Sequence, residues 1–220
     1  MSKKQFAVIG LGRFGSSVAK TLYELDNEVM GVDTDDEKVQ NISEHITHAI
    51  QVDATDENSL KSLGIRNFDV AVIAIGADIQ ASIMATLIVK EMGVKYIIAK
   101  ANSEIHAKVL YKIGADKVVL PERDMGTRVA HSLVSSNILD YIELSDDYNI
   151  AEIVTPSKWY GKTLSELNLR ANYGLNIMAI KREDNIEVSP NSDYVIKEND
   201  IVVVIGDTKS LDKIQISTKK

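Results

Sequence analysis

The feature that most constrains this chain is a glycine-rich turn at residues 10–15, with the sequence Gly-Leu-Gly-Arg-Phe-Gly. An apolar stretch at residues 6–9 leads into the turn, and the ten residues after it carry apolar side chains at helical spacing. Glycines between a strand and a helix are typical of a dinucleotide-binding fold. Gly10 allows the tight turn, Gly12 lets a pyrophosphate approach the backbone, and Gly15 lets the helix pack close to the strand. Phosphates would lie on free N–H groups at the positive end of that helix.

A carboxylate follows at the spacing that such a site needs. A second strand, expected at residues 28–32, ends in Asp33, which lies 18 residues after Gly15. Dinucleotide-binding folds place a ribose-binding carboxylate about 20 residues on. Asp33 is therefore predicted to hold the ribose hydroxyls. The alternative is that Asp33 caps the next helix.

The first half of the chain alternates apolar strands with helical patterns. Strands are expected at residues 6–9, 28–32, 49–52, 69–75, 95–99 and 117–120. Helices are expected at residues 16–25, 35–43, 55–63, 79–92 and 104–113, with Thr55 and Ser103 placed to cap two of them. Strands separated by helices predict an α/β fold, a doubly wound parallel sheet in the order 3-2-1-4-5-6.

The pattern changes after a further helix, which begins at Pro121 and runs to about residue 135. We place the boundary of a second, smaller α+β lobe within residues 139–147, giving domains 1–139 and 140–220. Its strands are expected at residues 148–154, 175–180, 185–188 and 200–205, with a short helix at 163–169 and a closing helix at 210–214.

Composition narrows the classes of function. The chain has 220 residues, no cysteine and a formal net charge of −7. An acidic chain without a basic cluster is a poor candidate for binding nucleic acid. Without cysteine there is no disulfide, thiolate metal site or cysteine nucleophile. No apolar run approaches the ~18 residues of a membrane span, so a membrane role would come through a partner.

The carboxyl ends of the predicted strands meet at one edge of the sheet, where ligands bind in open α/β folds. Asp53 could contact the adenine edge or the pocket floor, or only shape the turn it begins. Gly76 could let the backbone pass close to a nucleotide, or be a plain turn glycine. Arg13 stands beside the phosphate turn, and its alternative is a solvated side chain at a helix start. Glu122 could bridge a metal near phosphate, although glutamate is ordinary at a helix start.

Catalytic groups do not stand out in the sequence. Tyr96 and Lys100 match the Tyr-x-x-x-Lys pair of short-chain dehydrogenases, but a strand separates the two residues by ~13 Å. The four histidines have no metal-ligand spacing on a helix, and no Gly-x-Ser-x-Gly elbow appears. A nucleotide site without catalytic groups indicates a sensor. An NAD-dependent oxidoreductase whose catalytic residues escape recognition stays the alternative.

These segments together resemble the RCK (KTN) domain family, the regulatory subunits of bacterial Ktr and Trk potassium-uptake systems. The resemblance is carried by residues 8–15, 32–33, 53–55, 74–76 and 120–126, and the tail at residues 148–214 resembles the attached RCK C-terminal (TrkA-C) domain. Its more specific parts are the Gly-Arg-Phe-Gly turn and the Pro-Glu-x-Asp-Met-Gly segment.

The resemblance implies a cytoplasmic, non-enzymatic gating subunit at the inner face of the membrane. It implies homodimers in an octameric ring under a membrane-embedded potassium-translocating subunit. ATP and ADP are the implied ligands, with NAD(H) as a further one. Arg13 would reach the terminal phosphate in a neighbouring subunit, and Glu122 would place Mg²⁺ or another cation. The predicted nucleotide site contains Gly10, Leu11, Gly12, Arg13, Phe14, Gly15, Asp33, Asp53, Ala54, Thr55, Ile75, Gly76, Lys100 and Glu122.

The same family suggests a cyclic di-AMP receptor between two C-terminal lobes. Arg170 would offer donors to a phosphate, and Asn176 would read a base edge. Ile177 and Pro190 would wall the rings, and Ala171 lies beside the arginine. The residues alone also fit a plainer interpretation, with Ile177 in the core, Pro190 in a turn and Arg170 a surface charge.

Overall fold

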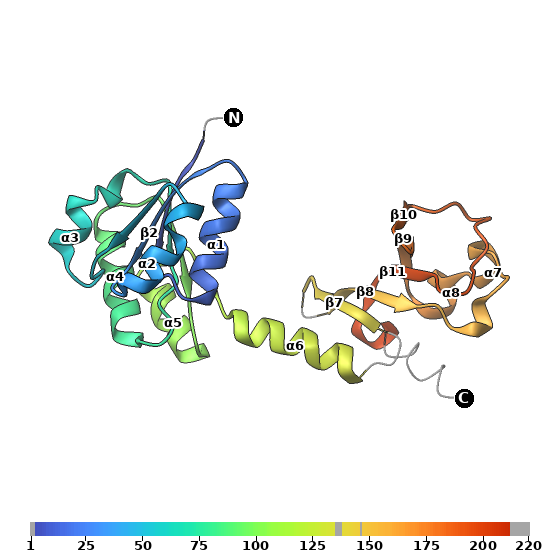
Figure 1. Ribbon diagram of the computed structural model, residues 1–220. Helices are drawn as coiled ribbons and strands as arrows, with labels where there is room; N and C mark the ends of the chain where they lie inside the picture. Colours follow the sequence, from blue (N-terminus) through green and yellow to red (C-terminus); the bar gives the residue numbers. More distant parts are fainter. Residues whose placement is uncertain (1–2, 135–137, 146, 212–220) are drawn as a thin grey trace. The chain divides into compact units, whose positions relative to one another are not determined.

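The computed structural model describes residues 3–134, 138–145 and 147–211. Residue contacts divide the chain into two units, Met1–Arg123 and Asp124–Lys220, and each has its own sheet (Figure 1). The division falls inside helix α6, Pro121–Val134, near its first turn. The domain boundary at residues 139 and 140 stays a prediction.

The described part of the first unit contains a six-stranded parallel sheet in the order β3-β2-β1-β4-β5-β6, which confirms the predicted fold class and strand order. Its strands are β1 Gln5–Ile9, β2 Glu28–Asp33, β3 His48–Gln51, β4 Val70–Ile73, β5 Tyr96–Lys100 and β6 Lys117–Val119. β1 pairs with both β2 and β4. The chain therefore reverses its direction of travel across the sheet beside β1, and ligands bind at the carboxyl ends next to such a point.

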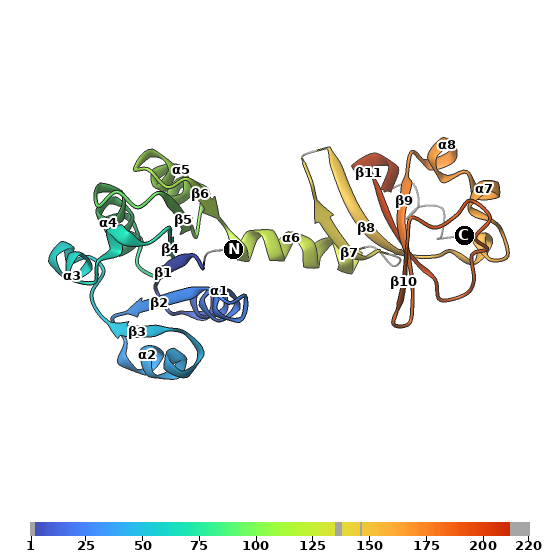
Figure 2. The ribbon, with the colours of Figure 1, turned by 90° about the horizontal axis from the view of Figure 1, so that it is seen from above.

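Helices cover both faces of this sheet, as Figures 1 and 2 show. They are α1 Arg13–Glu24, α2 Asp36–Ile42, α3 Glu57–Ser62, α4 Ile79–Glu91 and α5 Glu104–Lys112, with 3-10 turns η1 Ser43–His45 and η2 Ile65–Asn67. Alternate residues of β1 supply two cores. Val8 is buried with α1 and α2, whereas Ala7 and Ile9 are buried with α3, α4 and α5. This two-sided burial explains the continuous apolar strands.

The starts of these helices differ in one respect that bears on function. Side chains cap α2, α3, α4 and α5 by accepting hydrogen bonds from backbone N–H groups; the caps are Asp35, Asp56, Asp78 and Ser103. The prediction that Thr55 caps α3 is wrong, because the Asp56 carboxylate accepts from the Asn58 N–H instead. Helix α1 has Gly12 at its N-cap position and therefore has no side-chain cap. Its first N–H groups therefore lack the partner that a capping side chain would supply.

The described part of the second unit holds a five-stranded antiparallel sheet in the order β10-β9-β11-β8-β7. The strands are β7 Ile138–Glu143, β8 Tyr148–Val154, β9 Asn176–Arg182, β10 Asn185–Val188 and β11 Ile201–Asp207. The sequence pattern predicts a lobe boundary rather than β7 at these positions. β7 is an edge strand, so its pairing with β8 defines it, and local patterning does not show such pairing.

One face of this second sheet packs against short helices and Trp159, which is 2% exposed. The helices are η3 Ser157–Trp159, α7 Leu164–Leu167 and α8 Leu169–Tyr173. The single helix expected at residues 163–169 is two, because Asn168 adopts a left-handed conformation with φ +40° and separates them. Residues 208–211 are helical, as expected for the closing helix, and the rest of that helix lies outside the described residues.

Candidate nucleotide site

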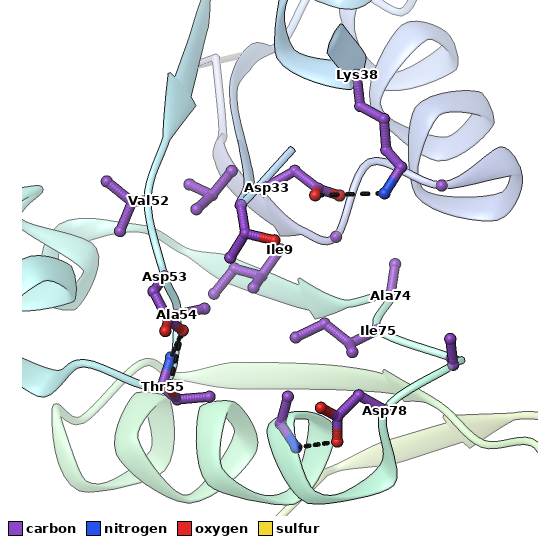
Figure 3. A pocket seen from close by; sticks show the side chains of 17 residues that line it. Ile9, Asp33, Lys38, Val52, Asp53, Ala54, Thr55, Ala74, Ile75 and Asp78 are labelled. Carbon is purple, nitrogen blue, oxygen red and sulfur yellow. Dashed lines mark hydrogen bonds and ion pairs between the residues drawn. The ribbon is translucent and has the colours of Figure 1, made fainter. Parts of the chain in front are cut away.

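A cavity of about 450 Å³ opens at the carboxyl ends of β1, β2, β3 and β4 (Figure 3). Several residues predicted for the nucleotide site line it together, namely Gly10, Gly12, Asp33, Asp53, Ala54, Thr55, Ile75 and Gly76. Ile9, Val32, Val52 and Ala74 add apolar walls. An apolar pocket with a few convergent polar groups is the usual form of a site for a small organic ligand.

The three glycines of the turn have different reasons to be glycine. Gly10 has φ +97°, which favours glycine. A Cβ on Gly15 would lie 1.8 Å from the Gly10 carbonyl oxygen, so helix α1 could not pack there. Gly12 has φ −69° and ψ −175°, ordinary values for any residue, and a Cβ there would meet no described atom within 4 Å. Folding therefore does not require glycine at position 12, and the open space lies on the cavity wall.

Asp33 organises the turn as well as lining the cavity. Its Oδ2 accepts a 2.7 Å hydrogen bond from the Leu11 N–H, and its Oδ1 accepts one of 3.0 Å from the Asp35 N–H. The side chain of Asp33 is only 9% exposed. The alternative that Asp33 caps α2 is wrong, because Asp35 is the cap. Leu11 itself takes part through its backbone, since its side chain is buried in the α1 and α2 core.

Asp53 lines the cavity and also shapes the turn after β3. Its Oδ1 accepts 2.8 Å hydrogen bonds from both the backbone N–H and the hydroxyl of Thr55. Asp53 therefore both lines the pocket and shapes the turn that it begins, which were the two alternatives for this residue. Its contact with a base stays a prediction. Figure 3 shows Asp53, Ala54 and Thr55 along one side of the cavity.

Lys100 contacts three segments of the chain just outside the cavity lining. Its Nζ lies 2.6 Å from Glu122 Oε1 and 5.8 Å from the centre of the Phe14 ring. The same side chain covers Gly76, where an added Cβ would lie 3.2 Å from the Lys100 Nζ. The hydrogen bond from Lys100 holds the pKa of the Glu122 carboxyl below its usual value, and the charge of Arg13 lowers it a little further. The starts of α1 and α6 and the segment after β4 therefore all contact the same lysine.

Arg13 is the first residue of α1, and its side chain is exposed. It does not line the cavity, but its charge acts on Glu122. Arg13 and Lys100 carry two positive charges against the one negative charge of Glu122, and the balance suits a phosphate. Its contact with a terminal phosphate stays a prediction.

Sequence reasoning missed two charged residues that line the cavity, Lys38 and Asp78. Asp78 caps α4 by accepting from the Ala81 N–H at 2.9 Å. Lys38 lies on α2, and its Nζ is 3.5 Å from Asp33 Oδ1 and 3.4 Å from Asp35 Oδ2. Partial burial would lower the pKa of Lys38, but these two carboxylates outweigh burial and raise it above its usual value. Lys38 lies three residues after Asp35 on a helix, and this spacing was the available sequence signal for their ion pair.

The second unit has its own cavity, of about 440 Å³. Four residues of the predicted cyclic di-AMP site line it together, namely Arg170, Asn176, Ile177 and Pro190, whereas Ala171 is absent from the described lining. Ile177 also packs half-buried against the second core, so the plainer interpretation of that residue holds in part. These four residues come from α8, β9 and the segment after β10, and the fold brings them to one place.

Residues 3–134, 138–145 and 147–211 contain no group of three or more His, Cys, Asp or Glu side chains placed to share a metal ion. They also contain no helix with the length and apolar character needed to cross a bilayer.

Comparisons with known proteins agree with this architecture. The TrkA-N domain family matches residues 6–121 and the TrkA-C domain family matches residues 150–215. The Ktr system potassium uptake protein C of Bacillus subtilis (strain 168) is 52% identical over 213 residues, which cover 97% of this chain and 96% of that protein. The Ktr system potassium uptake protein A of the same organism is 46% identical, covering 98% of this chain and 97% of that protein.

Among solved structures, the GsuK channel bound to NAD has a TM-score of 0.70 at 17% identity, covering 100% of this chain and 40% of that chain. At that identity the likeness shows the fold alone. The matches to the two Ktr proteins extend over nearly the whole chain and confirm the resemblance found in the sequence. The chain therefore belongs to the family of Ktr potassium uptake proteins built from a TrkA-N and a TrkA-C domain.

Proposed function

We propose that this protein is a cytoplasmic, nucleotide-sensing regulatory subunit of a potassium transporter. The observation that carries the proposal is the cavity at the carboxyl ends of β1 to β4, where Gly12 leaves room that folding does not need. The uncapped start of α1 offers N–H groups to phosphate beside that room. ATP and ADP are the proposed ligands, and NAD(H) is a further one that the NAD-bound GsuK channel supports.

We infer regulation rather than catalysis. The described lining offers carboxylates, threonine hydroxyls and one lysine, all of which suit the binding of a nucleotide. The relatives are named as potassium uptake proteins. We infer a membrane-embedded potassium-translocating partner, through which this subunit lies at the inner face of the membrane. The partner should copurify with the tagged chain from membranes, and potassium uptake by the pair should depend on the nucleotide present.

A cation is proposed beside the terminal phosphates. Glu122 would supply a carboxylate ligand, and the described residues hold no group of three or more His, Cys, Asp or Glu side chains that could bind the ion by themselves. Phosphate oxygens would complete the coordination, as in Mg²⁺–nucleotide sites. Glu122 now pairs with Lys100, so a cation there would compete with that lysine.

Arg13 is expected to distinguish ATP from ADP. A charge-assisted hydrogen bond to a terminal phosphate contributes roughly 1.5–3 kcal/mol, so Arg13→Ala should cut the preference for ATP at least tenfold and leave ADP affinity nearly intact. Calorimetry with both nucleotides measures this. Arg66→Ala, an exposed arginine in η2, is the matched control. Equal losses for ATP and ADP would make Arg13 a general phosphate contact instead.

Assembly of the chain into dimers and a ring is expected to bury the apolar stripe of α6. Met125, Val129 and Leu133 recur every four residues, and their side chains are 53%, 48% and 80% exposed. Light scattering at micromolar concentration should give a mass several times that of one chain. Leu133→Asp should lower that mass, and Leu25→Asp, at an exposed leucine of the first unit, should not. A monomer with and without nucleotide would contradict the proposed ring.

Cyclic di-AMP is the proposed ligand of the second cavity, shared between two lobes. The Arg170 of each subunit would bind one of the two phosphates of the ligand, so we expect one ligand per dimer. Arg170→Ala should abolish binding of cyclic di-AMP and leave ATP binding unchanged. Titration of the full chain with cyclic di-AMP measures the stoichiometry. Lys162→Ala, an exposed residue outside the described lining, is the control. Absence of heat from a folded dimeric chain would remove this site.

A further inference from the structure

One charged side chain of the first cavity has no role in the account above. Lys38 lies on α2, and among the described residues that line the cavity it is the only cation, against the carboxylates of Asp33, Asp53 and Asp78. Figure 3 shows its side chain reaching back over Asp33, at the end of the cavity away from Asp78. Its position therefore places it beside the group predicted to hold the ribose.

Lys38 is held only loosely by its two carboxylate partners. The distances of 3.5 Å to Asp33 Oδ1 and 3.4 Å to Asp35 Oδ2 exceed the 2.7–2.9 Å usual for an ammonium–carboxylate hydrogen bond. The side chain is 44% exposed, and an ammonium has three donors. Donor capacity is therefore left for a ligand.

Asp33 by itself would satisfy only half of a ribose diol. Its oxygens accept from the Leu11 and Asp35 N–H groups, and each keeps a lone pair for a hydroxyl hydrogen. A carboxylate cannot donate, so the hydroxyl oxygens would still need a donor in this partly buried place. The Lys38 ammonium, 3.5 Å from Asp33 Oδ1, is a side-chain donor placed at that carboxylate.

We propose that Lys38 is a specificity-determining residue, which donates to a ribose hydroxyl oxygen while Asp33 accepts the hydroxyl hydrogen. The pair then selects nucleotides whose ribose keeps an unsubstituted diol. A ribose phosphate is disfavoured, because one lysine faces the two carboxylates of Asp33 and Asp35 and the local charge stays negative. The inference rests on the proposed nucleotide function and specifies the sugar end of the same site.

The test uses the full chain and calorimetry with ATP, ADP, 2′-deoxy-ATP and 3′-deoxy-ATP. Lys38→Met keeps the length of the side chain and removes its charge, and Lys38→Arg keeps the charge. We expect Lys38→Met to lower ATP and ADP affinity equally, by about three- to tenfold. The loss should shrink for the deoxynucleotide that lacks the contacted oxygen, and Lys38→Arg should retain most of the affinity. Lys61→Met, at an exposed lysine of α3 outside the cavity lining, should change nothing.

Melting temperatures without nucleotide separate recognition from structure, because a partly exposed ion pair adds little to stability. They should be nearly equal in the wild type and in all three variants. Unchanged ATP affinity in Lys38→Met, or equal losses for ATP and both deoxynucleotides, would overturn the role of Lys38 and leave the nucleotide site standing. A wild type that binds none of the four nucleotides would overturn the proposed function and this inference together.

Discussion

Gly12→Ala is expected to leave the fold intact and to lower ATP and ADP affinity at least tenfold, about 1.4 kcal/mol. The backbone at Gly12 suits alanine, and the new Cβ meets no described atom within 4 Å. At a compatible position, replacing glycine by alanine stabilises a protein by roughly 0.4–1 kcal/mol, so the melting temperature should hold or rise slightly. The methyl group would occupy the space that a phosphate needs. Calorimetry and thermal melting on the same sample measure both effects.

Gly15→Ala is the matched variant with the opposite outcome. Its Cβ would lie 1.8 Å from the Gly10 carbonyl oxygen, a backbone atom that cannot move aside alone. We expect a loss of more than about 3 kcal/mol in the free energy of unfolding and a fall of roughly 10 °C in melting temperature.

Equal binding by Gly12→Ala and the wild type would show that nucleotide does not approach the turn at Gly12.

Asp33→Ala should lower the affinity for ATP and for ADP alike, at least tenfold, because a charge-assisted hydrogen bond contributes roughly 1.5–3 kcal/mol. The same change leaves the Leu11 N–H without its 2.7 Å partner, so some loss of stability is expected too. Asp33→Asn keeps the shape of the side chain and one acceptor. Calorimetry on both variants, after thermal melting shows each to be folded, measures the effect.

Asp56→Ala is the control for Asp33. Asp56 caps α3 and lies outside the cavity lining, so its loss should cost about 1 kcal/mol of stability and leave nucleotide affinity within about twofold. Unchanged affinity in a folded Asp33→Asn variant would remove Asp33 from the binding site and leave it only as a support for the turn.

The first sheet could be predicted nearly strand for strand, because its signals are local. Buried parallel strands are apolar runs, and Gly93 and Gly114 follow the ends of α4 and α5. Asp33 could be placed from its spacing to the glycine turn. Its double role could not, because the hydrogen bond to Leu11 joins residues 22 apart in the chain and depends on how β2 lies beside β1.

The second unit shows why some features of the fold could not be predicted from the sequence. β7 is defined by pairing with β8, and Asn168 divides the expected helix by adopting a conformation that few residues other than glycine take. Lys38 was missed for a similar reason. A lysine on a surface helix is normally predicted to be a solvent-exposed charge, and only the folded cavity shows that Lys38 lies over Asp33.

The contacts of Lys100 couple ligand binding to the start of α6 within the first unit. Lys100 contacts Glu122 at the start of α6 and lies over Phe14 and Gly76 beside the cavity. The proposed nucleotide site and α6 therefore share one positive charge. Linkage makes such sharing reciprocal. A ligand that bound Lys100 in place of Glu122 would weaken the contact of Lys100 with the start of α6, and a change in α6 that released Lys100 would raise the affinity for that ligand by the same factor.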